Sequence, residues 1–173
     1  MPNHVMNKWK ISHIPQDKLD YVLNKITAVF EGNRLIDFDL IIPEPRYKRD
    51  CPADCIVNKD SHVEEVKDRP WFDWYTWRRK YWGTKWGAYD GYTHAGKTYI
   101  IMYFQTAWTF AEPVAMKLTE LGYDLDLSYA DEDYGSNCGR IQYCSHSGEW
   151  TRWSKDELKP NPAQWAKNLW ERG

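Results

Sequence analysis

Apolar and polar residues alternate along the first part of the chain. Trp9 and Ile11 fall on one side of the pattern, whereas Lys8 and Lys10 fall on the other. A period of two residues is typical of a strand with one buried face, so we expect a strand over residues 4–13, with its centre at 5–12.

The next segment has the spacing of a helix. Pro15 precedes it and Gly32 follows it, as at the ends of many helices, which predicts a helix over residues 17–30. The apolar positions of this helix are Leu19, Val22, Leu23, Ile26 and Phe30. Alternation then returns from Ile36 to Ile42 until Pro43 ends it, which predicts a second strand over 36–42.

The second half of the chain gives clearer patterns. Residues 98–105 are almost continuously apolar, as expected of a central strand covered on both faces. Thr109 and Glu112 have the spacing of a capping box and predict a helix over 110–121. Alternation over 123–129 predicts another strand, and hairpins around Gly135 and Gly148 follow. A last helix begins after Asn161 at Pro162.

The order of these elements predicts an α+β fold of the ferredoxin-like βαββαβ type. It consists of an antiparallel sheet with helices on one face, a large insertion at about 43–96, and a C-terminal hairpin plus helix. At 173 residues the chain is long enough to bury a core, and we expect a single domain over 1–173.

The insertion contains the most informative chemistry of the sequence. Between Trp71 and Trp86 aromatic side chains alternate with Arg and Lys, and Asp73 is the one acid. Rings stack on bases, while guanidinium and ammonium groups bind phosphate, so this segment suits a nucleotide-like ligand. The predicted ligand-binding residues are Trp77, Arg78, Arg79, Trp82, Gly83, Lys85 and Trp86. The alternative is a purely structural cluster, because tryptophan side chains also dominate protein cores.

Net charge, apolar stretches and cysteine spacing exclude several classes of protein. A net charge of −2 argues against a general nucleic-acid coat protein. No apolar stretch approaches the length of a membrane span, and the start MPNHVMNKWK lacks a signal peptide's apolar core. We therefore expect a cytoplasmic protein that does not associate with a membrane. The spacings of Cys51, Cys55, Cys138 and Cys144 fit no zinc knuckle, so we expect no metal, no cofactor and no disulfide.

Five segments together resemble the YubB-type ferredoxin-like domain family, an Api-like family of small phage and plasmid proteins. They are MPNHVMNKW, FDLIIPEP, YWGTKWGA, FQTAWTFAEPV and YADED, and the most specific piece is WGTKW followed by a strand ending in TAW. Tyr81 and Gly87 depart from the Asn and Asp that many relatives carry at these positions. The resemblance implies a phage or plasmid setting in a host cell and no catalytic activity.

No enzyme signature accompanies this resemblance. The sequence has no GxSxG, phosphate loop, GxGxxG or HExxH, and the acidic run Asp131 to Asp133 is typical of a solvated loop. We therefore expect a non-enzymatic accessory protein, active in counter-defence, that binds a nucleotide-like small molecule. The alternative is a protein-interaction module that inhibits a host defence protein through the same residues. Single-stranded nucleic acid, a homo-oligomer and a hidden enzyme are further hypotheses.

Overall fold

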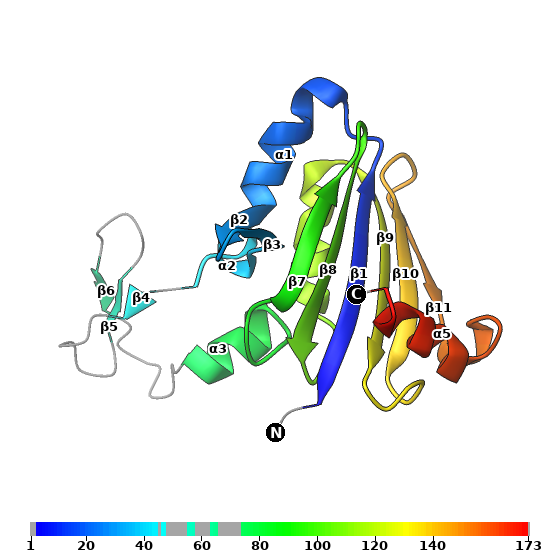
Figure 1. The fold of residues 1–173 in the computed structure, drawn as a ribbon. Helices are drawn as coiled ribbons and strands as arrows, with labels where there is room; N and C mark the ends of the chain where they lie inside the picture. The colour runs from blue at the N-terminus through cyan, green and yellow to red at the C-terminus, as the bar shows by residue number, and fades with distance from the viewer. Residues whose placement is uncertain (1–2, 45, 48–54, 58–62, 66–73, 173) are drawn as a thin grey trace.

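A six-stranded antiparallel sheet forms the body of the protein in the computed structural model (Figure 1). The structure describes residues 3–44, 46–47, 55–57, 63–65 and 74–172. The strands lie in the order β11-β10-β9-β1-β8-β7. Their bounds are β1 His4–Ser12, β7 Tyr89–Ala95, β8 Tyr99–Ala107, β9 Asp124–Asp131, β10 Cys138–Cys144 and β11 Glu149–Trp153.

Four of these strands and two helices make the ferredoxin-like unit. In chain order they are β1, α1 (Leu19–Ile26), β7, β8, α4 (Glu112–Leu118) and β9, which is βαββαβ. In space the fourth strand lies beside the first, the first beside the third, and the third beside the second. β1 is central, with Trp9 opposite Met102 on β8 and Leu127 on β9. The predicted ferredoxin-like fold, its central strand at 98–105 and its strand at 123–129 are confirmed.

The second strand of the unit is not where the sequence pattern placed it. The predicted strand over 36–42 is wrong, because β3 (Asn33–Ile36) ends there and α2 (Phe38–Ile41) begins. Asp37 is the N-cap of α2, since its carboxylate accepts a hydrogen bond of 2.9 Å from the Asp39 backbone N–H. The second strand is β7, which lies inside the predicted insertion over 43–96.

The first helix is also shorter than predicted. α1 ends at Ile26, and Thr27–Phe30 form β2, which pairs with β3 as a separate hairpin. The segment between α1 and β7 further contains α3 (Trp74–Tyr81) and a small sheet of β4 (Arg46–Tyr47), β5 (Cys55–Val57) and β6 (Val63–Glu65). The insertion therefore extends from β2 to the start of β7.

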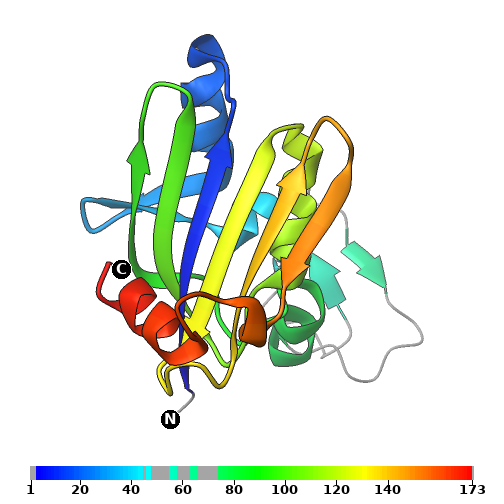
Figure 2. The same ribbon diagram turned by 90° about the vertical axis from the view of Figure 1, so that its right-hand side faces the viewer.

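Two apolar cores lie on opposite faces of the sheet. On one face α1 and α4 contribute Val22 and Leu118 to the core that surrounds Trp9. On the other face α5 (Pro162–Trp170) packs Leu169 against Met6 of β1 (Figure 2). The expectation of helices on one face thus holds for α1 and α4, whereas the C-terminal helix covers part of the other. Among the described residues no helix is both long and apolar enough to cross a membrane.

The close approach of β7 to β8 allows a direct test of this topology. A Cβ atom at Gly91 would lie 2.0 Å from the carbonyl oxygen of Tyr103. We expect Gly91→Ala to lower the free energy of unfolding by about 1–3 kcal/mol, because backbone atoms must move apart. In Gly87→Ala the new Cβ would meet nothing nearer than 3.9 Å, so this control should keep its stability. Equal urea midpoints for the two variants would contradict the pairing of β7 with β8.

Candidate functional site

Two of the predicted ligand-binding residues, Trp77 and Trp82, belong to the core. Their side chains are only 6% and 4% exposed. The indole N–H of Trp82 donates a hydrogen bond of 2.9 Å to the carbonyl of Ile42, and its ring packs edge-on against Phe38 at 5.9 Å. Stacking on a ligand requires an exposed ring face, so the predicted ligand-binding role is wrong for these two tryptophans and the structural alternative holds for them, because the insertion uses them to pack against the sheet.

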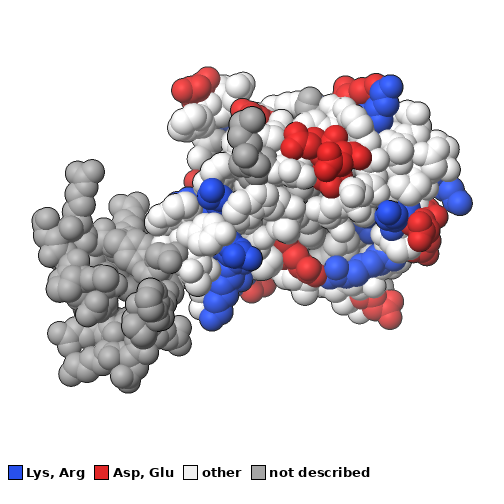
Figure 3. All heavy atoms as spheres, turned by 90° about the horizontal axis from the view of Figure 1, so that it is seen from below, with Lys and Arg blue, Asp and Glu red and all other residues white. Residues whose placement is uncertain are grey.

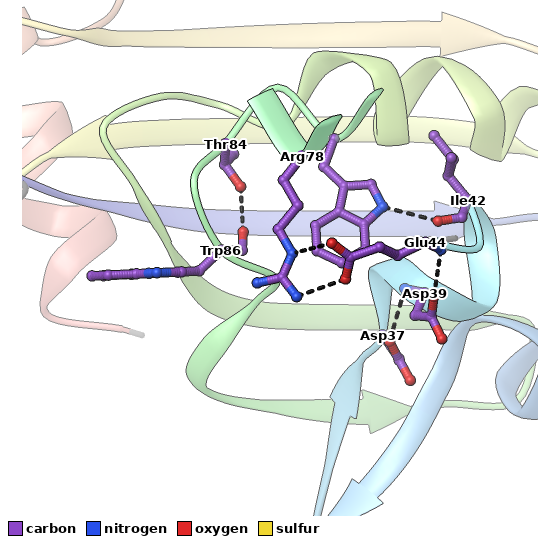
Figure 4. Close-up of polar contacts among 8 residues, drawn as sticks. Asp37, Asp39, Ile42, Glu44, Arg78, Thr84 and Trp86 are labelled. Atoms are coloured by element: carbon purple, nitrogen blue, oxygen red, sulfur yellow. Dashed lines mark hydrogen bonds and ion pairs between the residues drawn. The ribbon is translucent and has the colours of Figure 1, made fainter. Parts of the chain in front are cut away.

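Arg78 does not present a free charge either. Its guanidinium donates two hydrogen bonds to the carboxylate of Glu44, at 2.9 and 2.6 Å. The same group lies over the ring of Trp82 at 4.9 Å and over that of Trp74 at 5.2 Å. Figure 4 shows this pair, with the Trp86 side chain pointing away from it. Because its planar fork is already matched by a carboxylate, Arg78 stabilises the insertion rather than offering a phosphate site.

Gly83 lies just after the end of α3, where its backbone N–H donates a hydrogen bond of 3.0 Å to the carbonyl of Arg78. Its φ of +79° lies in the left-handed region, and a Cβ there would lie 2.8 Å from Cδ of Pro113. The Thr109 hydroxyl donates a hydrogen bond of 2.5 Å to the Gly83 carbonyl. The predicted capping box is thus wrong, since Ala111 is the N-cap of α4 and Thr109 holds the loop instead. Gly83 positions Lys85 and Trp86 and is better placed for that role than for ligand contact.

Partly exposed rings and cations of the segment, together with Tyr89 and Trp108, form a continuous row, which we call the aromatic–cation row. The guanidinium of Arg79 lies over Tyr75 at 5.4 Å, and Tyr75 contacts the ring of Trp108 edge-on at 6.2 Å. The ammonium of Lys85 lies 5.2 Å from the ring of Trp108 and 4.7 Å from that of Trp86. Trp86 in turn contacts Tyr89 at 6.1 Å. The row consists of Arg79, Tyr75, Trp108, Lys85, Trp86 and Tyr89.

Three residues of this row, Tyr75, Tyr89 and Trp108, are not among the predicted ligand-binding residues. Of these three, Trp108 lies farthest along the chain from the predicted segment. It follows β8 with a φ of +73°, which is unfavourable for a bulky side chain, and it is 36% exposed. Its backbone N–H donates to the Asn3 carbonyl at 2.9 Å, and its backbone carbonyl accepts from the Asn137 side-chain amide at 3.2 Å. The motif ending in TAW contained the signal, but only the fold brings this ring beside Lys85.

Acidic groups border the Tyr89 end of the row. The Tyr89 hydroxyl lies 2.7 Å from Nδ1 of His4, and the backbone N–H of His4 donates to the Glu132 carboxylate at 3.2 Å. Burial, together with the charges of Asp90 and Glu132, raises the pKa of Tyr89 to about 12. Tyr89 therefore stays protonated at neutral pH. Figure 3 shows one acidic group and one basic group apart from each other on this face, whereas other acidic and basic side chains lie side by side.

The cysteines do not assemble a site within the described part of the chain. There, no group of three or more His, Cys, Asp or Glu side chains could hold a metal ion. Cys138 is buried and Cys144 is exposed, and both are free thiols. Cys51 lies outside the described residues, as does the side chain of Cys55, so the absence of zinc and of a disulfide stays a prediction.

The division of the tryptophans into core and surface can be measured. We expect Trp82→Ala to lower the free energy of unfolding by about 3–5 kcal/mol, because it leaves a cavity and an unpaired carbonyl. We expect Trp86→Ala to cost about 1 kcal/mol or less, since the half-buried ring leaves no enclosed cavity. Urea denaturation of both variants compares the two costs. A loss for Trp86→Ala as large as that for Trp82→Ala would place Trp86 in the core.

Comparison with known proteins agrees with this architecture. Residues 82–168 match a family described as the ferredoxin-like domain in Api92-like protein. The match begins at Trp82 and covers Lys85, Trp86 and Trp108, together with the sheet from β7 to β11. Neither a curated protein nor a solved structure matches the chain. Since the match spans half of its residues, the chain belongs to the family of ferredoxin-like domains found in Api92-like proteins.

Proposed function

We propose that this chain is a non-enzymatic accessory protein of a phage or plasmid, of the YubB type, that acts in the host cytoplasm. It inhibits a host defence protein by binding it through the aromatic–cation row. Support comes from the chemistry of the row, because Trp, Tyr and Arg are the residue types that contribute most binding energy in protein interfaces. The family description names a fold and no activity, so the proposal rests on the row.

Trp108 is the observation that carries this proposal. A large ring that is 36% exposed contributes less to folding than a core residue, and its left-handed backbone costs about 1–2 kcal/mol for an L-residue. A residue that is costly for stability and yet presents a ring to solvent is typical of a functional position. Lys85 and Tyr75 hold this ring in place, so it is preorganised for a partner.

The shape of the surface favours a protein over a small ligand. Ligand sites are usually concave and enclose most of the ligand. A cavity near the row is lined, among the described residues, by Glu31, Asp37 and Asp90 and by no Lys or Arg, and such a lining is unsuitable for phosphate. Arg79 and Lys85 instead lie outside this cavity, each over an aromatic ring. The partner surface we expect is acidic and carries apolar side chains.

A nucleotide-like ligand is the second candidate. Lys85 lies between the rings of Trp86 and Trp108, and cations alternating with rings also suit a base and its phosphate. Of the residues first predicted for this role, Arg79 is exposed and Lys85 and Trp86 are half-buried, whereas Trp77 and Trp82 are buried and the half-buried Arg78 is paired with Glu44. A second copy of the chain is a third occupant, which the oligomeric state in solution tests.

Variants of the row test the proposal. A host protein captured by the immobilised wild-type chain is identified and its affinity measured by calorimetry. We expect Arg79→Ala and Lys85→Ala each to weaken binding by about 1–3 kcal/mol, the usual range for a lost charge-assisted contact. Trp108→Gly should weaken it at least as much while leaving the melting temperature nearly unchanged, because glycine adopts a positive φ without strain.

Lys97→Ala provides the matched control, since Lys97 is an exposed base in the turn between β7 and β8, outside the row. Wild-type affinity in all three row variants would refute the proposal. A thermal-shift screen with mono-, di- and cyclic nucleotides separates the second candidate. We expect no shift, whereas a nucleotide that raises the melting temperature of wild type but not of Lys85→Ala would establish the nucleotide as the ligand instead.

A further inference from the structure

A cavity of about 530 Å³ opens beside the β2–β3 hairpin, at the point where the loop after α3 enters β7. Its volume falls in the range of about 300–1,000 Å³ that small-molecule sites occupy. Four aromatic side chains contribute to its wall: Phe30, Phe38, Trp82 and Tyr89. Phe38 and Trp82 are fixed by the core, whereas Phe30 is 69% exposed at the rim. The cavity therefore lies directly above the packed core and has an accessible entrance at Phe30.

The charges around this cavity are of one sign. In the described part of the chain, three carboxylates line it, those of Glu31, Asp37 and Asp90, and no Lys or Arg does so. Among the described residues none of the three is paired with a basic side chain. The carboxylate of Asp37 accepts a hydrogen bond from the backbone N–H of Asp39 as the N-cap of α2. Asp90 also contributes, after burial, to the raised pKa of Tyr89, as expected beside a negative charge. The cavity thus disfavours anions and attracts cations.

We propose that this cavity binds a small organic cation in which an ammonium or guanidinium group is joined to a flat or apolar body. The apolar body lies against Phe30 and Tyr89, above the buried Phe38 and Trp82, and the cationic group lies beside Asp90 and Glu31 at the mouth. Aromatic faces and carboxylates both attract such a cation, whereas a neutral or anionic analogue loses one or both interactions. The ligand is a free small molecule, since the cavity has the volume of a ligand site.

This site is chemically opposite to the aromatic–cation row. The row presents Arg79 and Lys85, whereas the cavity presents three acids and no base. Tyr89 borders both, with its ring against Trp86 on one side and in the cavity wall on the other. Binding of a cation here does not depend on the function proposed for the row.

Three ligands that share an indole ring test the inference. Tryptamine carries an ammonium group, tryptophol is neutral, and indole-3-propionate is an anion. By calorimetry on the full chain we expect tryptamine to bind, tryptophol to bind at least tenfold more weakly, and indole-3-propionate to give no measurable heat. Equal binding of all three, or no binding of tryptamine at millimolar concentration, would overturn the inference.

Two variants locate the site. Asp90→Asn and Glu31→Gln remove charge with little change in shape, and asparagine tolerates the φ of +43° found at position 90. Each substitution should weaken tryptamine binding at least fivefold, and the melting curve of each variant should match that of wild type. Glu120→Gln is the control, because Glu120 is an acid that pairs with Lys117 away from the cavity. A loss in the control as large as in Asp90→Asn would show nonspecific charge attraction only and would overturn the assignment.

Discussion

Burial of Trp82 is the interaction on which the rest of the site depends. Its indole N–H bonds the Ile42 carbonyl, and its ring lies among Phe38 and Trp77, so one side chain joins α2, α3 and the sheet. The Arg78–Glu44 pair lies over the same ring and covers it. Because an unpaired buried N–H costs about 1–3 kcal/mol, the indole has one favourable position. The loop that follows is therefore held in place at its first residue.

This anchor explains why neighbouring residues in one short motif have different roles. Trp82 and Thr84 point inward, and the Thr84 hydroxyl bonds the carbonyl of Trp86 within the loop. Lys85 and Trp86 then lie at the surface beside Trp108, which reaches the same place from the end of β8. Local interactions thus produce a basic, aromatic surface on a chain whose net charge is −2. The cavity on the other side of Tyr89 carries the opposite charge, because three acidic residues line it.

Much of the sheet could be predicted from the sequence, because β1, β8 and β9 carry long and regular hydrophobic patterns. The strand predicted over 36–42 was wrong, because the same alternating pattern is compatible with another structure. There, Ile36 ends a strand, Asp37 caps a helix, and the short helix α2 follows. β7 was missed because it is an edge strand with a bulge after Tyr89 and few apolar residues. Tertiary pairing with β8 decides its structure, and local pattern does not encode that pairing.

For the candidate site, the sequence identified the right segment but not the division within it. Residue type cannot distinguish Trp82 from Trp86, because burial depends on which side of the loop faces the sheet. Nor could it bring Trp108 into the row, since this contact joins residues far apart in the chain. The TAW motif marked the position, whereas its left-handed backbone and its ring contacts are properties of the fold.

Hydrogen exchange of the individual indole N–H groups, followed by NMR, tests the account most directly. The account predicts slow exchange for the Trp82 N–H, which is buried and bonded to Ile42, and rapid exchange for those of Trp86 and Trp108. Assignment by single Trp→Phe variants identifies each signal. Exchange at Trp82 as rapid as at Trp86 would contradict the division of the cluster into a structural core and an exposed binding surface.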